Sequence, residues 1–215
     1  MKIALCLYGV VGNKTTKAGS NSDSVEILKM GYDKYKKNLL SKYDTDVFLH
    51  TWSTDFEQEI LNLYKPKNSI IEKQEIFDIP SHVKGDSFEQ PKRRQNHYSR
   101  WRSTQKVLKL LSNSDEDYDF VLLSRFDLGL ENPFLFENLS KEDLYVSNWF
   151  GVKYDNCSDI FDDGRGIFYR LNKINKTLNV NKFGRGYPYD GEGILDLWFL
   201  GAPKKINVFQ NLFDQ

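Results

Sequence analysis

Short apolar runs divide the chain at intervals, and each has the length of a buried strand. They are, in order, 3–7, 46–50, 69–72, 120–124, 144–147 and 197–200. Most of the intervening segments place apolar residues three and four positions apart, as helices that pack on a sheet do. This alternation predicts an α/β fold: a three-layer α/β/α domain around a mainly parallel, mixed sheet.

The predicted helices follow from their end signals as well as from their spacing. They cover about 23–39, 54–65, 98–111 and 203–213. Asp23 and Glu26 have the spacing of a capping box at the start of the first helix, and Pro203 suits the first turn of the last. The polar stretch 78–96 is longer than an ordinary connection, so it is either a flap or a disordered loop.

Composition narrows the class of protein. The chain has 215 residues, 40% of them hydrophobic, which is enough for one domain over 1–215. Its 30 basic and 30 acidic residues cancel, so we expect neither nucleic acid nor an acidic membrane as a general partner. The two cysteines lack metal-type spacing and favour a reducing cytoplasm. The apolar start is too short to span a bilayer and is read as a first strand, so no transmembrane segment is expected.

Two charged residues follow the most apolar of these runs. Arg125 and Asp127 come directly after 120–124, at the end of a predicted central strand, where α/β sheets usually bind ligands. A carboxylate can bind Mg²⁺ or Mn²⁺ that also contacts a diphosphate, and an arginine can neutralise the remaining negative charge. The alternative is a structural ion pair between Arg125 and Asp127 that caps the strand.

Four stretches in succession resemble small glycosyltransferases of the GT-A fold. They are KIALCLYG at 2–9, DVFLHTW at 46–52, the helix YSRWRSTQKVLKLL followed by YDFVLLSRFDL at 98–128, and DLWFLGAPKKINVFQNLF at 196–213. In that family a DxD motif ends the central strand, and its last Asp binds the divalent ion that holds the nucleotide-sugar diphosphate. Asp127 matches this last position. Arg125 stands where the first Asp would be, which puts the usual ribose contact and the need for a metal in doubt.

The resemblance implies further site residues. The donor nucleotide would lie against Tyr8, Gly9, Val10, Thr51, Trp52, Tyr98, Arg102 and Arg125. Asp196, which precedes the predicted last strand, is the first candidate for the carboxylate beside the donor sugar, and Asp190 and Glu192 are weaker ones. Such a carboxylate either removes the acceptor proton or stabilises positive charge at the anomeric carbon. For Asp190 and Glu192 a solvated turn is the alternative.

These expectations combine into one function and its alternatives. The sequence predicts a cytoplasmic hexosyltransferase, assisted by Mn²⁺ or Mg²⁺, that moves a sugar from a nucleotide-sugar donor to a hydroxyl of a carbohydrate acceptor. UDP-glucose is the first donor to test, because it is common among similar enzymes. The alternative is a nucleotide- or glycan-binding module without turnover. A sugar nucleotidyltransferase is disfavoured because GVVGNKTTKAGS at 9–20 does not form the phosphate loop expected after the first strand.

Overall fold

A mixed sheet of six strands forms the centre of the computed structural model, which describes residues 1–11, 24–78, 91–130, 133–148, 168–170 and 194–214. The strands are β1 (Lys2–Gly9), β2 (Asp44–Thr51), β3 (Asn68–Ile71), β4 (Phe120–Arg125), β6 (Leu144–Asn148) and β8 (Ile194–Gly201). Their order is β3-β2-β1-β4-β8-β6. The first four in this order are parallel to one another, whereas β8 runs antiparallel to both β4 and β6.

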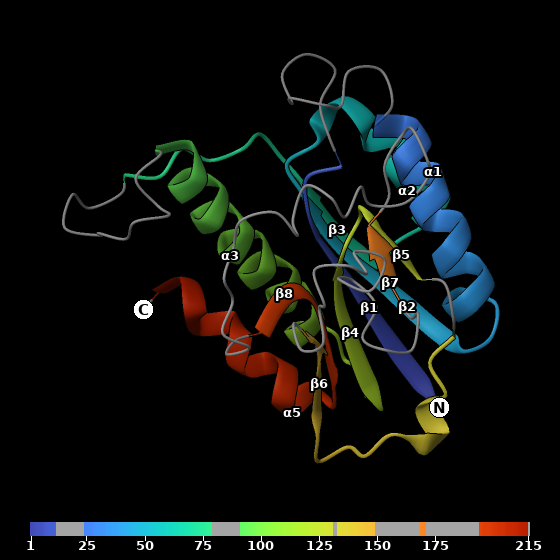
Figure 1. Cartoon of the computed structure of the whole chain (residues 1–215). Helices are drawn as coiled ribbons and strands as arrows, with labels where there is room; N and C mark the ends of the chain where they lie inside the picture. The colour runs from blue at the N-terminus through green and yellow to red at the C-terminus, as the bar shows by residue number, and fades with distance from the viewer. Residues whose placement is uncertain (12–23, 79–90, 131–132, 149–167, 171–193, 215) are drawn as a thin grey trace, which may run out of the picture.

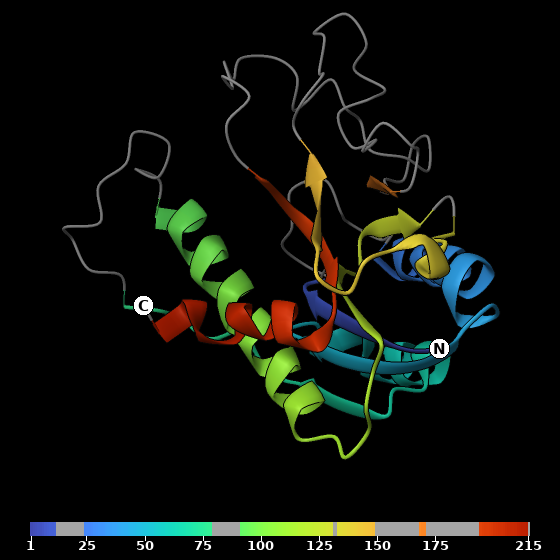
Figure 2. The ribbon, with the colours of Figure 1, turned by 90° about the horizontal axis from the view of Figure 1, so that it is seen from below.

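Helical segments connect and follow these strands. They are α1 (Ser24–Tyr35), which continues as the π-helical turn η1 (Lys36–Leu40), then η2 (Thr54–Phe56), α2 (Glu57–Tyr64), α3 (Pro91–Ser112), η3 (Phe136–Asn138), α5 (Pro203–Ile206) and the 3₁₀ segment η5 (Asn207–Asp214). In Figure 1, α1 and α2 lie on one side of the strands and α3 with α5 on the other. Figure 2, turned by 90°, shows η5 crossing α3, and these two elements are in contact.

Alternation along β1 explains why helices pack on both faces of the sheet. Successive side chains of a strand point to opposite faces. Ile3, Leu5 and Leu7 belong to a core that includes residues of α1 and α2. Ala4 and Cys6 belong to a second core that includes residues of α3 and α5. The central strand is therefore buried on both faces, as its uninterrupted apolar sequence predicts.

A two-stranded antiparallel sheet extends the first core beyond the end of β4. It consists of β5 (Leu128–Leu130) and β7 (Phe168–Arg170). Phe126, Leu128 and Leu130 are buried in the core beneath α1. The chain therefore turns at Asp127 and continues as β5, whose side chains add to the same core.

The structure confirms the α/β class and the existence of all six predicted strands, and it corrects two boundaries. The third predicted helix begins at Pro91 instead of residue 98, so the proposed long loop loses its last six residues to α3. The last strand begins at Ile194, so Asp196 lies within β8 instead of before it. Within the part of the chain that the structure covers, no helix has both the length and the apolar character needed to cross a bilayer.

Candidate functional site

The strand order creates a topological switch point between β1 and β4. From β1 the chain passes through α1 to β2 on one side, whereas β4 lies on the other side of β1. Because β1 and β4 are parallel, their carboxyl ends meet at one edge, with Tyr8 paired to Arg125. Open α/β sheets bind ligands beyond such an edge, where the connections leave in opposite directions. This edge is the candidate site.

Arg125 and Asp127 form a closed ion pair at this edge. Arg125 Nε donates to Asp127 Oδ1 at 2.7 Å, and Arg125 Nη2 donates to Asp127 Oδ2 at 2.6 Å. Their side chains retain exposures of 18% and 11%. Burial alone would lower the pKa of the Arg125 guanidinium, but the Asp127 carboxylate outweighs burial and raises it. The two-pronged geometry is the strongest form of an arginine–carboxylate contact.

Residues of α1 and η1 fix the backbone that carries this pair. The Tyr35 hydroxyl lies 2.8 Å from Ser124 Oγ and donates to the Arg125 carbonyl at 3.2 Å. Asn38 Nδ2 donates to the Leu130 carbonyl at 2.6 Å. Tyr35 and Asn38 are buried, so these bonds are shielded from water. They tie the segment from Ser124 to Leu130 to the helical layer at both of its ends.

Gly9 gives the end of β1 an open face. Its φ of +102° lies in the region that favours glycine, and a Cβ built on it would meet no atom of the described residues within 4 Å. Its N–H donates to Ser103 Oγ of α3 at 2.8 Å, and its carbonyl accepts from the Trp52 backbone N–H at 3.3 Å. The backbone of Gly9 is therefore held in place by both of its polar groups.

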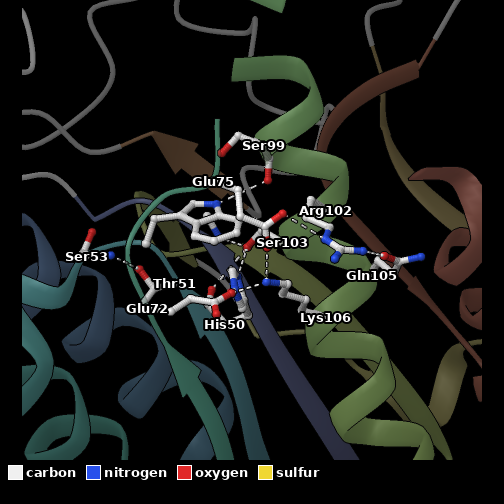
Figure 3. Close-up of polar contacts among 12 residues, drawn as sticks. His50, Thr51, Ser53, Glu72, Glu75, Ser99, Arg102, Ser103, Gln105 and Lys106 are labelled. Atoms are coloured by element: carbon white, nitrogen blue, oxygen red, sulfur yellow. Dashed lines mark hydrogen bonds and ion pairs between the residues drawn. The ribbon is translucent and has the colours of Figure 1, made fainter. Parts of the chain in front are cut away.

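His50 links this glycine to the segment after β3 (Figure 3). The Nδ1 of His50 lies 2.6 Å from Ser103 Oγ, and its Nε2 lies 3.0 Å from Glu72 Oε1. Because the Glu72 carboxylate can only accept, the ring proton lies on Nε2, and Nδ1 accepts from the Ser103 hydroxyl. We therefore assign the neutral tautomer with its proton on Nε2, which donates to Glu72. His50 is fully buried, and both of its ring nitrogens are engaged by protein groups.

Ion pairs hold the 72–78 segment against α3. Lys106 donates to both Glu72 and Glu75, and Arg102 Nε donates to Glu75 Oε2 at 3.3 Å. Figure 3 shows the two carboxylates turned toward the helix. The Lys106 ammonium also lies 4.9 Å from the centre of the Trp52 ring. Burial alone would raise the pKa of Glu72, but its bonds to Lys106 and His50 outweigh burial and lower it.

The structure groups some of the predicted donor-binding residues and separates others. Tyr8, Gly9 and Arg125 lie together at the switch point with Asp127, and Val10 follows Gly9 directly. Thr51 and Trp52 are adjacent to this group, but both side chains are buried. Thr51 Oγ1 accepts from the Ser53 N–H at 3.1 Å, and Trp52 Nε1 donates to the Ser99 carbonyl at 3.3 Å.

Tyr98 and Arg102 face a different neighbourhood. The Tyr98 ring packs with Phe77 and Phe213, at 6.0 Å and 6.2 Å between ring centres. Arg102 lies over the same Phe213 ring at 5.0 Å and donates to Gln105 Oε1 at 2.6 Å. Both side chains therefore contact the 72–78 segment or η5. Their predicted contact with the donor stays a prediction.

The predicted catalytic carboxylates are placed only in part. Asp190 and Glu192 lie outside the described residues. The backbone of Asp196 lies in β8, two residues before Trp198 in the sequence, and Trp198 pairs with Ser124. Because β8 is antiparallel to β4, this position lies beyond the carboxyl end of β4. The backbone of Asp196 is thus at the same edge of the sheet as Arg125.

Arg100 and Ser103 are residues of this edge that sequence reasoning missed. Ser103 contacts Gly9 directly, and Arg100 lies one helical turn before it. Burial raises the pKa of the Tyr8 phenol, and the positive charges of Arg100 and Arg125 oppose that rise. The sequence did contain a signal for Ser103. Residues four apart lie on one face of a helix, and Ser99 and Ser103 lie eight and four residues before the apolar Val107, so they share the face that meets the sheet.

A divalent ion at Asp127 would need a change in the observed contacts. Both Asp127 oxygens are bonded to Arg125, and no group of three or more His, Cys, Asp or Glu side chains is arranged for a metal within the described ranges. One carboxylate can suffice when substrate phosphates complete the shell. As it stands, however, the pair places a fixed positive charge where the ion would bind.

Comparison with known proteins does not assign a family. No protein-family model matches the chain, and no curated protein matches it in sequence.

Proposed function

We propose that this chain is a glycosyltransferase that moves a sugar from a nucleotide-sugar donor to a hydroxyl of a carbohydrate acceptor, within a GT-A-like fold. One observation carries the proposal. An open, glycine-only turn at the end of β1 lies beside a guanidinium at the end of β4, across the switch point of the sheet. Backbone that a ligand can approach closely and a cation for a diphosphate are what binding of such a donor requires.

The transfer exchanges one bond at the anomeric carbon for another and moves one proton. The bond between the anomeric carbon and the diphosphate oxygen breaks, and its electron pair leaves with the nucleoside diphosphate. The acceptor oxygen forms a new bond to the anomeric carbon, and its proton passes to a carboxylate. In this chain Arg125 would stabilise the departing charge. Asp196 is the first candidate for the carboxylate because its backbone lies at the same edge of the sheet.

A second candidate function is supported by the closed pair. An arginine that is held by both carboxylate oxygens of Asp127 is also compatible with a module that binds a nucleotide or a glycan and does not turn it over. The two functions differ in product formation. A transferase should release UDP slowly from UDP-glucose even when water is the acceptor, whereas a binding module should not.

The first prediction concerns Asp196. With the protein, a panel of nucleotide sugars beginning with UDP-glucose, and a mixture of carbohydrate acceptors, we expect release of nucleoside diphosphate. Asp196→Asn should reduce that rate about a hundredfold, the scale of a lost general base, while donor affinity measured by calorimetry stays unchanged. Glu142→Gln is the matched control, because this exposed carboxylate pairs with Lys204 and should leave the rate unchanged.

Three outcomes would count against parts of this proposal. Donor binding without release for every sugar tested would favour the binding module. Neither binding nor release would contradict both functions. An Asp196→Asn variant that transfers at the parent rate would remove Asp196 from the reaction and leave the transferase assignment standing.

A further inference from the structure

We propose that Arg125, oriented by Asp127 and assisted by Arg100, neutralises the diphosphate of the bound nucleotide directly, so that nucleotide binding needs no divalent ion. This inference rests on the proposed function and replaces the metal contact that the sequence predicts at Asp127. It assigns Asp127 as a positioning residue that acts through the arginine.

The contacts of Asp127 give the first reason. Each of its carboxylate oxygens accepts a short hydrogen bond from Arg125. An ion bound to either oxygen would lie a few ångströms from the guanidinium, and at short range in a partly buried site the repulsion between the two cations is large. Binding the ion in the usual way would therefore require breaking a two-pronged pair whose partners are only 18% and 11% exposed.

The geometry of Arg125 gives the second reason. A guanidinium has five N–H donors, and the pair with Asp127 uses Nε and one N–H of Nη2. The N–H groups that face away from Asp127, including both on Nη1, can form the fork that matches two phosphate oxygens. Since the carboxylate locks the plane of the guanidinium, little conformational entropy is lost when an anion binds. An arginine without this partner would have to be ordered by the ligand.

Arg100 supplies the third reason. It lies one turn before Ser103, whose hydroxyl accepts from Gly9 N–H at 2.8 Å, so its helical turn lies over the end of β1. Its charge acts on the Tyr8 phenol together with that of Arg125. The Arg100 guanidinium thus adds its positive charge to that of Arg125 near the end of β1. A nucleoside diphosphate, which carries at least two negative charges, is the complementary ligand.

Calorimetric titration with UDP tests this inference. Wild-type protein should bind UDP in the presence of EDTA, and adding Mn²⁺ in place of EDTA should change the affinity less than about twofold. Arg125→Gln should weaken UDP at least tenfold, a loss of about 1.4 kcal/mol, and should leave the affinity for uridine unchanged because uridine has no phosphate. Lys109→Gln is the control, since it removes one exposed positive charge from the same α3.

Asp127→Asn separates positioning from metal binding. If Asp127 positions Arg125, the amide oxygen can still accept from the guanidinium, and UDP affinity in EDTA should fall less than about threefold. Circular dichroism would confirm that the variants are folded. UDP binding that appears only with Mn²⁺ and disappears in Asp127→Asn would overturn the inference and leave the proposed function intact. Absence of both UDP and uridine binding under all conditions would instead contradict the proposed donor itself.

Discussion

Acidification from pH 7 to about 4 is expected to reduce the free energy of unfolding by up to about 3 kcal/mol through His50 alone. Burial lowers the pKa of His50 from 6.5 to about 4, and the nearby Lys106 charge adds to this effect while Glu72 and Glu75 oppose it. The folded protein therefore keeps His50 neutral at pH values at which the unfolded chain has already bound a proton.

The sign of this dependence follows from proton uptake. Between pH 6.5 and about 4 the unfolded state binds more protons at His50 than the folded state does, so stability falls as the pH falls. Protonation in the folded state would also turn Nδ1 into a donor facing the Ser103 hydroxyl. That hydroxyl would then have to redirect its proton, and the contact that holds Gly9 would be disturbed.

Urea denaturation at several pH values between 7 and 4 measures the effect. His50→Asn should be less stable at pH 7 but should lose the His50 part of the pH dependence, because the amide oxygen can still accept from Ser103 and does not titrate. His97→Asn is the matched control: burial and the charge of Arg100 lower the pKa of His97 too, but this side chain is only partly buried. Equal pH dependence in wild type and His50→Asn would show that other groups cause it.

Glu72 adds a second pH range in which stability is lost, and this range lies below that of His50. Its lowered pKa in the folded state means that its stabilising contribution is present above its ordinary value of 4.5 and is lost as the pH falls further. The two groups therefore act in sequence, His50 first. Because both belong to the contacts between α3 and the 72–78 segment, we expect this segment to loosen from the helix on acidification.

Local patterns in the sequence were sufficient for most of the fold. The apolar run at 3–7 is buried on both faces and became the central strand β1. The stripe that includes Leu28, Tyr35 and Leu39 is the buried face of α1 and η1. These predictions succeed because burial of a strand or of one helix face leaves a periodic signal in the chain itself.

Boundaries set by tertiary contacts were harder to predict. The polar start of α3 has no apolar stripe, so residues 91–96 were assigned to a loop, yet Gln95 is held by the backbone of Phe77 on the neighbouring segment. Pro91 at the first position of the helix was the local signal for its start. The start of β8 was missed for a related reason, because Ile194 and Leu195 pair with β6, a strand far away in the sequence.

Predictions about the candidate site also succeeded where local patterns were sufficient and failed where tertiary contacts decide. The sequence correctly brought Tyr8 and Arg125 to one edge, because carboxyl ends of parallel strands coincide. It did not establish which side of α3 meets the sheet. Tyr98 and Arg102 do share one side of the helix, as their spacing predicts, but contacts with Phe213 and Glu75 show that this side faces η5 and the 72–78 segment. Spacing defines a face, and only packing shows what that face contacts.

Asp127→Ala is expected to lower the free energy of unfolding by about 3 kcal/mol, the lower end for a buried ion pair that loses one partner. The Arg125 guanidinium would keep its charge in a site where it is only 18% exposed, without the carboxylate that now compensates it. Denaturant unfolding at pH 7 measures the loss. Glu137→Ala is the control, since Glu137 is an exposed carboxylate near the Tyr43 hydroxyl, and it should change stability by less than about 0.5 kcal/mol.

A double-mutant cycle with Arg125→Met separates the pair from the loss of each side chain. Replacing both charges removes the uncompensated cation, so the double variant should be more stable than Asp127→Ala alone, and the coupling energy should be about 2 kcal/mol. A coupling below about 0.5 kcal/mol would mean that the carboxylate does not depend on Arg125 for its stability. Asp127 would then have an oxygen available for a divalent ion, and the metal-assisted form of the reaction would regain its physical basis. A strong coupling would instead identify the pair as a preformed anion site, because the carboxylate that stabilises the fold also orients the guanidinium.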